Sequence, residues 1–209
     1  MEAWKLLVAA AVAYLCGSFS SSVAVSKAFL HKDLRDYGSG NAGLTNSYRL
    51  MGAKLTLLVL IGDVLKAVVG VGLGGWLLGP LGRLIAGAFV IIGHMFPVFF
   101  GFRGGKGVLV GATMLFLFDW RVFLVALALF VGAVALTRWV SLGSILGAIS
   151  FPISTFVCYH DVVMTVLAAL MGGAVVVAHR GNIGRILSGT ERRFTFGGTH
   201  ELTDHREEK

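Results

Sequence analysis

Charged residues are scarce in this sequence. Only 14% of its 209 residues are Asp, Glu, Lys or Arg, whereas an ordinary soluble domain has about 25%. Hydrophobic residues make up 56% of the chain, and its mean hydropathy is +0.82. A soluble fold cannot cover that much apolar surface with so few charges. The composition therefore excludes an ordinary soluble enzyme and indicates a polytopic membrane protein, whose apolar surface faces lipid.

Cysteine is also rare, and metal-binding patterns are missing. Cys16 and Cys158 both lie in apolar stretches without metal-ligand spacing, so we interpret both as small hydrophobic residues. No Ser–His–Asp set and no cluster of carboxylates stands out in the sequence. We therefore expect neither a metal nor another cofactor, and no covalent acyl-enzyme is required.

Long apolar runs predict an all-α integral membrane protein of about seven transmembrane helices, since a spanning helix needs roughly 17–25 apolar residues. The runs are Leu6–Phe29, Leu55–Leu78, Leu84–Phe100, Val108–Phe118, Val122–Leu136, Leu142–Tyr159 and Val162–Val177. The fourth run is short, and either extends back through the preceding glycines or forms a half-span. We predict one polytopic membrane domain over residues 1–193, followed by a polar, disordered tail over residues 194–209.

The basic residues predict the orientation of the chain. With seven spans, thirteen Lys and Arg fall on one side of the membrane and three on the other, the latter being Lys5, Arg83 and Arg121. Positive charge marks the cytoplasmic side, so we expect the N-terminus outside and the C-terminus in the cytoplasm. The net charge of +7 then reflects topology and attraction to anionic lipid, and does not indicate nucleic acid.

Three polar segments, all on the predicted cytoplasmic side, are candidates for chemistry. The first runs from Gly38 to Arg49 and alternates glycines with hydroxyl and amide side chains. Glycines let backbone N–H groups converge on an anion, and an arginine can grip a phosphate with two N–H groups. This pattern favours a phosphate site over a flexible polar linker.

The second segment is Gly104-Gly105-Lys106-Gly107. It is not a nucleotide-binding P-loop, because Gly107 stands where Ser or Thr would bind magnesium and the earlier glycine of that motif is missing. A glycine-rich turn with a lysine at the start of a helix still suits phosphate. A loop that only sets membrane topology is the alternative interpretation.

The third segment, His179 to Glu191, begins at the end of the last apolar run. His179 and Asn182 are three residues apart, so one helix face can carry both. Ser141 and Ser144 have the same spacing at another predicted helix start; we expect Ser141 to cap that helix and Ser144 to face a site. Asp63 and Lys66 lie within a span. We interpret the two as a structural ion pair, with a substrate role as the alternative.

Taken in order, these segments resemble the bacterial acyl-phosphate:glycerol-3-phosphate acyltransferase family. The resemblance covers Tyr14 to Glu191. It is carried by Lys32-Asp33-Leu34-Arg35, Gly38 through Arg49, Asp63-Val64-Leu65-Lys66, Gly93-His94-Met95-Phe96-Pro97-Val98-Phe99, Phe102 through Val108, Arg138 with Val140-Ser141, and His179 through Glu191. The tail beyond Arg192 is unusually long for that family, and Leu44 and Leu109 replace its usual alanines.

The resemblance implies a cytoplasmic (inner) membrane enzyme that transfers an acyl group from acyl phosphate to the 1-hydroxyl of sn-glycerol 3-phosphate. It implies membrane lipid as surroundings and a functional link to the enzyme that makes acyl phosphate. The residues implied to be catalytic are Ser39, Arg49, His179 and Asn182. Those implied to bind substrate are Gly38, Gly40, Asn41, Thr45, Asn46, Gly104, Gly105, Lys106, Gly107 and Ser144. Glu191 would be chiefly structural.

Two other functions fit parts of the sequence. A transporter of an anionic solute would also have many helices and a basic pocket, but its polar residues should lie near the midplane and on both sides. An acyltransferase that uses a thioester donor carries a His-x4-Asp pair, and His31 and Asp36 have that spacing. A two-residue match of this kind arises readily by chance.

Overall fold

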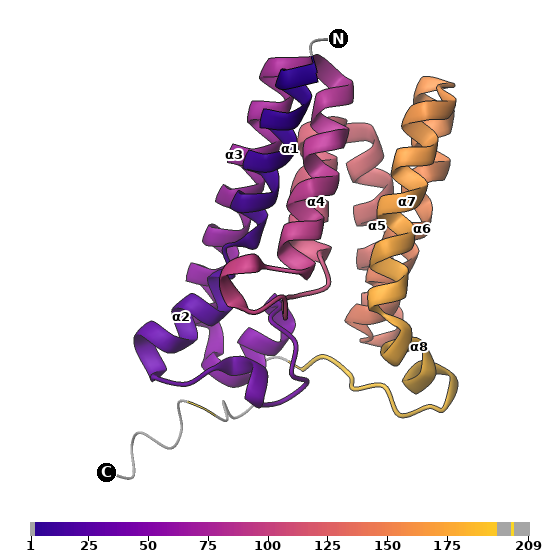
Figure 1. Ribbon diagram of the computed structural model, residues 1–209. Helices are drawn as coiled ribbons and strands as arrows, with labels where there is room; N and C mark the ends of the chain where they lie inside the picture. Colours follow the sequence, from indigo (N-terminus) through magenta and orange to yellow (C-terminus); the bar gives the residue numbers. More distant parts are fainter. Residues whose placement is uncertain (1–2, 196–201, 203–209) are drawn as a thin grey trace.

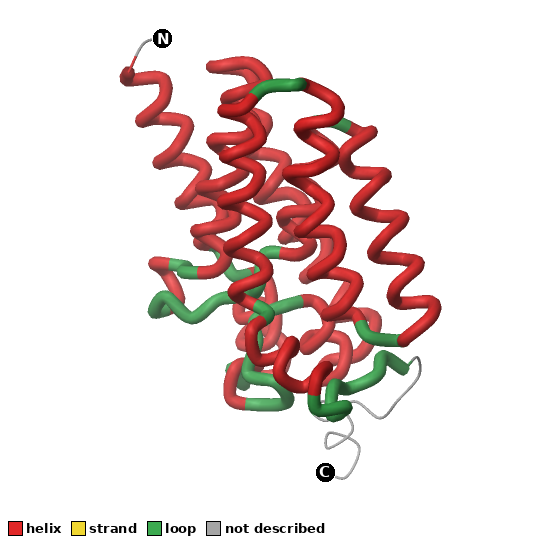
Figure 2. The backbone as a smooth tube through the Cα atoms, turned by 90° about the vertical axis from the view of Figure 1, so that its right-hand side faces the viewer, coloured by secondary structure: helices red, strands yellow, loops and turns green. Residues whose placement is uncertain are grey.

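The computed structural model describes residues 3–195 and residue 202, and within these residues all regular structure is helical. The elements in chain order are α1 (Ala3–Ser18), α2 (Ser21–Leu30), the 3-10 helix η1 (Leu34–Asp36), α3 (Leu44–Met95), the 3-10 helix η2 (Val98–Phe100), α4 (Val108–Phe118), α5 (Trp120–Thr137), α6 (Val140–Tyr159), α7 (Val162–Ala178) and α8 (Arg180–Leu187). The predicted all-helical class is confirmed. Figures 1 and 2 show the long helices side by side, with most loops gathered at the two ends of the bundle.

The long element α3 is folded back on itself. Gly79 has φ 66° and precedes Pro80, which interrupts the helix because proline donates no hydrogen bond and glycine tolerates positive φ. Residues 53–78 form a first arm and residues 80–95 an antiparallel second arm. The arms approach so closely that a Cβ placed on Gly82 would lie 2.1 Å from the carbonyl oxygen of Gly74. The second and third predicted apolar runs are these two arms.

The first predicted run is not one helix. The chain breaks at Phe19 and Ser20, and Figure 1 shows α2 turning away from the axis of α1. At the break, the carbonyl oxygen of Phe19 accepts from Nζ of Lys66 at 2.8 Å, and the serine hydroxyls that follow bind groups on other segments. The hydroxyl of Ser21 donates to Asp63 at 2.9 Å, and that of Ser22 donates to the carbonyl of Ala42 at 3.0 Å.

The third and fourth runs are shorter as helices than predicted. α3 ends at Met95, because Pro97 disfavours helical geometry in the residue before it. α4 has only 11 residues and does not extend back through the glycines, since Gly107 has φ 78° at its start. The connection between Phe96 and Gly107 is therefore a loop that contains only the short 3-10 helix η2.

Within the described part of the chain, four segments are long and apolar enough to cross a membrane: Ala3–Leu30, Leu44–Phe100, Trp120–Thr137 and Val140–Tyr159. A fifth results if α7 and α8, which meet at a bend of 58°, are taken as one span. Because α3 is a hairpin and α4 a short apolar helix, each of the seven predicted runs still contains a helix. Seven crossings and the orientation of the termini remain predictions.

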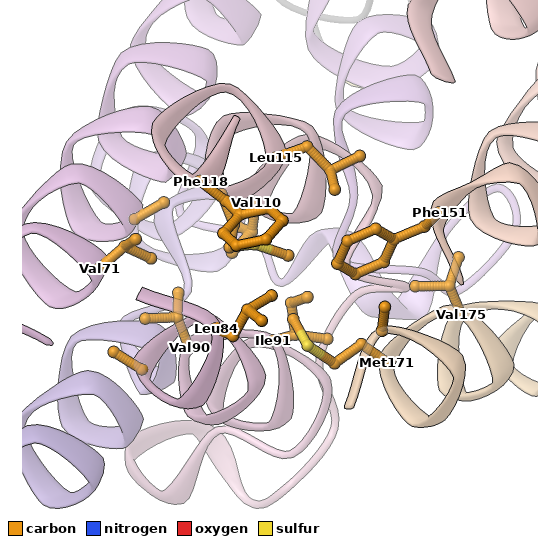
Figure 3. Close-up of a cluster of buried hydrophobic side chains, with 14 of the residues drawn as sticks. Val71, Leu84, Val90, Ile91, Val110, Leu115, Phe118, Phe151, Met171 and Val175 are labelled. Atoms are coloured by element: carbon orange, nitrogen blue, oxygen red, sulfur yellow. The ribbon is translucent and has the colours of Figure 1, made fainter. Parts of the chain in front are cut away.

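The bundle has two parts, α1–α4 and α5–α8 (Figure 1), and the apolar core lies where they meet around α4. Figure 3 shows Phe151, Met171 and Val175 facing Val110 and Leu115 of α4 and Ile91 of α3. On the other side of α3, a Cβ on Gly93 would lie 2.3 Å from the carbonyl oxygen of Tyr14. Small residues thus let α1 and α3 approach closely, as is common for helices that pack in lipid.

Candidate active site

A cavity of about 900 Å³ opens between the two parts of the bundle and collects residues from all three polar segments. One end is polar and includes Ser39, Arg49, Lys106, Ser144, His179 and Asn182. The other end is apolar and includes Met114, Leu115, Phe123, Phe151 and Met171. All four residues predicted to be catalytic, Ser39, Arg49, His179 and Asn182, therefore lie around one space.

The first polar segment is held open by its own side chains. Gly38 and Gly40 both have positive φ, 62° and 69°, which a residue with a Cβ rarely adopts. The amide oxygen of buried Asn46 accepts a hydrogen bond from the backbone N–H of Ser39 at 3.0 Å, and its Nδ2 donates to the carbonyls of Leu34 and Tyr37 at 3.5 and 3.4 Å. Asn46 lines the cavity, but its amide shapes the loop.

Arg35 ties the base of this segment to the second polar segment. Its Nη1 donates to the carbonyl oxygens of Phe100 at 2.6 Å and Arg103 at 2.8 Å. Its Nη2 is paired with Asp33 at 2.8 Å. Hydrogen bonds from the Arg35 guanidinium hold the pKa of the Asp33 carboxyl well below its usual range, so the pair stays ionised. The loops before and after α3 are thus fixed relative to each other.

The second segment differs from its prediction. Lys106 and Gly107 line the cavity, whereas Gly104 and Gly105 pack behind it against α3. The N–H of Gly104 donates to the carbonyl of Met95 at 3.2 Å, and that of Gly105 donates to the carbonyl of His94 at 3.1 Å. The two N–H groups that we expected to bind substrate are therefore already used within the protein.

A hydrogen-bonded chain links the second and third segments. The Lys106 ammonium donates to Oδ1 of Asn182, and Nδ2 of Asn182 donates to Oε1 of Glu191 at 2.6 Å. Glu191 also accepts from Ser141 at 2.7 Å and from Arg185 at 2.8 Å. Asn182 can therefore present only one orientation, because each end of its amide has a partner of fixed polarity.

The pKa values of Lys106 and Glu191, two members of this hydrogen-bonded chain, are both lower than usual. Burial, with the nearby charges of Arg185 and Arg49, lowers the pKa of Lys106 to about 8, and the opposing charge of Glu191 limits the drop. Burial acts to raise the pKa of the Glu191 carboxyl, but hydrogen bonds from Ser141, Asn182 and Arg185 outweigh it and lower the pKa. One carboxylate thus stands among several cations, and the polar end of the cavity remains positive.

His179 lies at the bend between α7 and α8, where the continuous helix face predicted for His179 and Asn182 is broken. Both residues nevertheless line the cavity. The Nδ1 atom of His179 is 2.8 Å from the carbonyl oxygen of Val175. A carbonyl can only accept, so Nδ1 carries the proton. Nε2 has no hydrogen-bond partner among the described residues and can accept a proton. Burial lowers the pKa of His179, which keeps the imidazole neutral at physiological pH.

Of the two serines, Ser144 lies where it was expected and Ser141 does not. Trp139, not Ser141, is the N-cap of α6, and the Ser141 hydroxyl instead holds Glu191. The prediction that Ser141 caps the helix is therefore wrong. Its hydroxyl donates a hydrogen bond to the carboxylate of Glu191, which is distant in sequence but close in space. Ser144 lines the cavity as predicted, with its hydroxyl donating to the carbonyl of Val140 at 2.9 Å. Its oxygen can still accept a hydrogen bond.

The ion pair predicted for Asp63 and Lys66 is confirmed, with 2.8 Å between Asp63 Oδ1 and Lys66 Nζ and both side chains buried. The cavity also includes residues that we had not predicted to bind substrate: His94, Arg185, Glu191 and Arg192. Arg185, Glu191 and Arg192 follow Asn182 in sequence, and their charges in a short polar stretch were the available signal. No spacing in the sequence connects His94 with Lys66.

Comparisons with known proteins agree with this architecture. A family model described as glycerol-3-phosphate acyltransferase matches residues 7–189. The glycerol-3-phosphate acyltransferase of Thermoanaerobacter sp. (strain X514) is 37% identical over 187 residues, covering 90% of this chain and 94% of the relative. That of Fusobacterium nucleatum is 40% identical over 184 residues, covering 88% and 95%.

Solved structures are similar as well. The crystal structure of PlsY, an integral membrane glycerol 3-phosphate acyltransferase, in its glycerol 3-phosphate form has a TM-score of 0.85 and 35% identity. The match covers 91% of this chain and 96% of that chain. The lysophosphatidic acid form has a TM-score of 0.82 and 34% identity, with coverage of 91% and 95%.

Proposed function

This chain belongs to the glycerol-3-phosphate acyltransferase family, and we propose that it transfers an acyl group from acyl phosphate to the 1-hydroxyl of sn-glycerol 3-phosphate. The products are 1-acylglycerol 3-phosphate, also called lysophosphatidic acid, and inorganic phosphate. The observation that carries the proposal is a cavity that joins a positive, polar end to an apolar end between helices. Such a cavity suits substrates that combine phosphate with an acyl chain.

The polar end has the charge needed for two phosphates. Arg49, Lys106, Arg185 and Arg192 line it, and Glu191 supplies an opposing carboxylate. Asp63, also in the lining, is balanced by Lys66. Arg49 has no hydrogen-bond or ion-pair partner within residues 3–195, so its guanidinium is available for a bidentate contact with phosphate. Lys106 contributes a point charge that Asn182 positions.

The apolar end suits the acyl chain. Its lining comes from α4, α5, α6 and α7, with Met114, Phe123, Phe151 and Met171 among the residues. Burying an acyl chain among such side chains stabilises the complex by about 0.8 kcal/mol per methylene. With its chain at this end, the donor would place its carbonyl carbon near the polar residues.

We propose direct transfer without an acyl-enzyme. The 1-hydroxyl oxygen attacks the carbonyl carbon of the acyl phosphate and forms the ester bond. The bond from that carbon to the phosphate oxygen breaks, and phosphate leaves with the electron pair. The hydroxyl proton passes to Nε2 of His179, which can accept it, or to the departing phosphate. Cations and oriented donors around the phosphates supply electrostatic stabilisation and positioning.

Three observations weigh against the rival functions. His31 and Asp36 are exposed and do not line the cavity, which removes the basis for a thioester-dependent site on that pair. The cytoplasmic loops are short and leave little surface for coenzyme A or a carrier protein. For a transporter, polar residues would be needed toward both ends of the cavity, and here most polar lining residues come from the three segments, joined by Asp63 and His94 of α3 and by Ser141 and Ser144 of α6.

Topology follows from the same proposal. We infer that this multi-pass protein lies in the bacterial inner membrane as a single domain over residues 1–193, with seven spans, its N-terminus outside and its C-terminus in the cytoplasm. The thirteen-to-three division of basic residues supports that orientation. The site would then face the cytoplasm, where an enzyme that makes acyl phosphate can supply the donor.

The test is an assay of the purified protein with acyl phosphate and sn-glycerol 3-phosphate. We expect lysophosphatidic acid and phosphate to form in equal amounts, and Asn182→Ala to reduce both severely. His31→Asn is the matched control and should retain activity, because His31 lies outside the cavity. Full activity in Asn182→Ala, or phosphate release without lysophosphatidic acid, would contradict the proposal.

A further inference from the structure

A buried polar network connects α3 to the cavity and has no part in the transfer described above. It consists of Asp63 and Lys66 on the first arm of α3 and His94 on the second arm, all less than 10% exposed. Nζ of Lys66 lies 2.8 Å from Asp63 Oδ1, 2.8 Å from the carbonyl oxygen of Phe19, and 2.9 Å from Nδ1 of His94. Asp63 Oδ1 also accepts from Ser21.

The network sets the tautomer of His94. An ammonium group has three protons and accepts none, so the three neighbours of Lys66 Nζ must all be acceptors. Nδ1 of His94 therefore carries no proton, and the neutral imidazole carries its proton on Nε2. Asp63 balances the Lys66 charge and keeps the ammonium form in this buried place.

His94 borders the cavity, and its Nε2 is on the opposite edge of the ring from Lys66. Asp63 belongs to the cavity lining as well. Nε2 lies where the first and second polar segments, hereafter the first and second loops, meet. A Cβ placed on Gly105 of the second would be 2.2 Å from His94 Nε2 and 2.9 Å from the carbonyl oxygen of Ala42 in the first. Within the described residues, the only hydrogen bond of the His94 side chain is the one at Nδ1. An oriented donor thus remains unused beside the cavity.

The second loop lacks donors at this point. The N–H groups of Gly104 and Gly105 are bonded to the carbonyls of Met95 and His94, so they cannot turn toward a bound anion. The backbone carbonyl of His94 accepts from the Gly105 N–H, whereas the side chain of His94 can donate its Nε2–H. A phosphate oxygen is a strong acceptor for such a group.

We propose that His94 is a phosphate-binding residue, which donates Nε2–H to an oxygen of a phosphate held between the two loops, and that Asp63 and Lys66 are positioning residues that fix its tautomer. The ligand is a phosphate group, that of sn-glycerol 3-phosphate or that of the acyl donor. The inference rests on the proposed function for the identity of the ligand. The tautomer itself follows from the contacts of Lys66.

The test combines nitrogen-15 NMR of the histidine side chains in the full chain with kinetics. His94→Gln identifies the His94 signals by their loss. We expect the wild-type protein to show Nε2 protonated and Nδ1 unprotonated, and Lys66→Met to abolish this preference. Titration with sn-glycerol 3-phosphate or with inorganic phosphate should move the Nε2 signal; a response to the first alone assigns the acceptor's phosphate, and a response to both at similar concentrations assigns the shared phosphate group.

Two substitutions separate the donor from the bulk of the ring. His94→Phe keeps an aromatic ring without a donor, while His94→Gln keeps an N–H near the position of Nε2. We expect His94→Phe to weaken phosphate binding about ten- to a hundredfold, as for a lost hydrogen bond to a charged group, and His94→Gln to recover part of it. His31→Gln is the matched histidine control and should bind normally, because His31 is exposed outside the cavity.

An Nδ1-protonated tautomer, or an Nε2 signal that neither ligand moves, would overturn the inference even if variants failed to fold. Equal phosphate binding by wild type and a folded His94→Phe would overturn it too. These measurements do not depend on turnover. If the protein bound phosphate at His94 but transferred no acyl group, the proposed reaction would fall while this inference stood.

Discussion

The activity should fall as pH rises through the pKa of Lys106. Burial and the charges of Arg185 and Arg49 bring that pKa from 10.5 to about 8. The sign follows directly: a lysine is cationic below its pKa, so the charge that holds phosphate is present at neutral pH and lost in alkali. With a pKa of about 8, roughly 90% of the free enzyme carries the charge at pH 7 and roughly 10% at pH 9.

The loss of the Lys106 charge should lower kcat/KM for sn-glycerol 3-phosphate, because kcat/KM reports ionisations of the free enzyme. We expect a drop of about ninefold between pH 7 and pH 9, with a smaller effect on kcat, because bound phosphate favours the ammonium form. The assay follows lysophosphatidic acid at a fixed acyl phosphate concentration well below saturation, so that the free enzyme predominates, with a protein-free control for alkaline hydrolysis of the donor. The second ionisation of a phosphate monoester lies near pH 6 and does not interfere.

Lys106→Arg is the matched variant, since arginine remains charged over the whole range. Its activity should be lower, because the guanidinium does not reproduce the contact with Asn182, but its alkaline limb should disappear. A wild-type profile that is flat from pH 7 to 9, or an identical limb in Lys106→Arg, would refute the assignment of phosphate binding to the Lys106 ammonium.

Further predictions concern the same cavity and its orientation. Arg49→Lys should cost about ten- to a hundredfold in kcat/KM, as for losing a charged hydrogen bond of about 1.5–3 kcal/mol, and near-full activity at low substrate would contradict a bidentate contact. Glu191→Gln should move the alkaline limb to lower pH, because the charge of Glu191 raises the pKa of Lys106; a limb that stays in place would exclude that coupling. It should also lower the melting temperature measured in detergent, since the carboxylate accepts from Ser141, Asn182 and Arg185. Activity should survive EDTA, and restoration of lost activity by an added divalent ion would show a metal requirement. Cysteines introduced at positions 2 and 200 should be labelled from outside and inside respectively, and labelling of position 200 in intact cells would reverse the topology.

The apolar runs predicted where helices would form but not where they would bend. A run of apolar residues is a local feature of the sequence and predicts a helix by itself. All seven predicted runs do contain helices. The break at Phe19 and Ser20 depends on acceptors supplied by Asp63 and Ala42, which are distant in sequence. Proline gave a local signal at Pro97, and there the helix does end just before it.

The candidate site was predictable to the extent that its residues share a motif. Glycines alternating with polar residues predicted a phosphate site from Gly38 to Arg49, and most of this segment lines one cavity together with Lys106, His179 and Asn182. Their connections were not predictable. Whether an N–H group is free depends on the tertiary partner, so the glycines at 104 and 105 looked like phosphate ligands although they bind the end of α3.

The contacts of the C-terminal tail could not be predicted from the sequence either, because they also depend on tertiary partners. The predicted disordered tail falls largely on residues 196–201 and 203–209, which are outside the described part of the chain. Of its described residues, Phe194 donates its N–H to the carbonyl of Arg138 at 2.7 Å, and Leu202 donates to that of Leu50 at 3.0 Å. Leu202 is also buried in an apolar cluster with Leu50 and Met51. A single leucine in a polar segment carries no sequence signal for such a contact.

Donor identity is the central claim, and one side-by-side assay tests it most directly. Purified protein is given sn-glycerol 3-phosphate with equal concentrations of acyl phosphate, acyl-CoA or acyl carrier protein bearing the same chain, and lysophosphatidic acid is quantified for each. We predict turnover with acyl phosphate alone, with one phosphate released per lysophosphatidic acid formed and no effect of His31→Asn. Robust turnover with acyl-CoA that His31→Asn abolishes would contradict the account and favour a thioester-dependent enzyme.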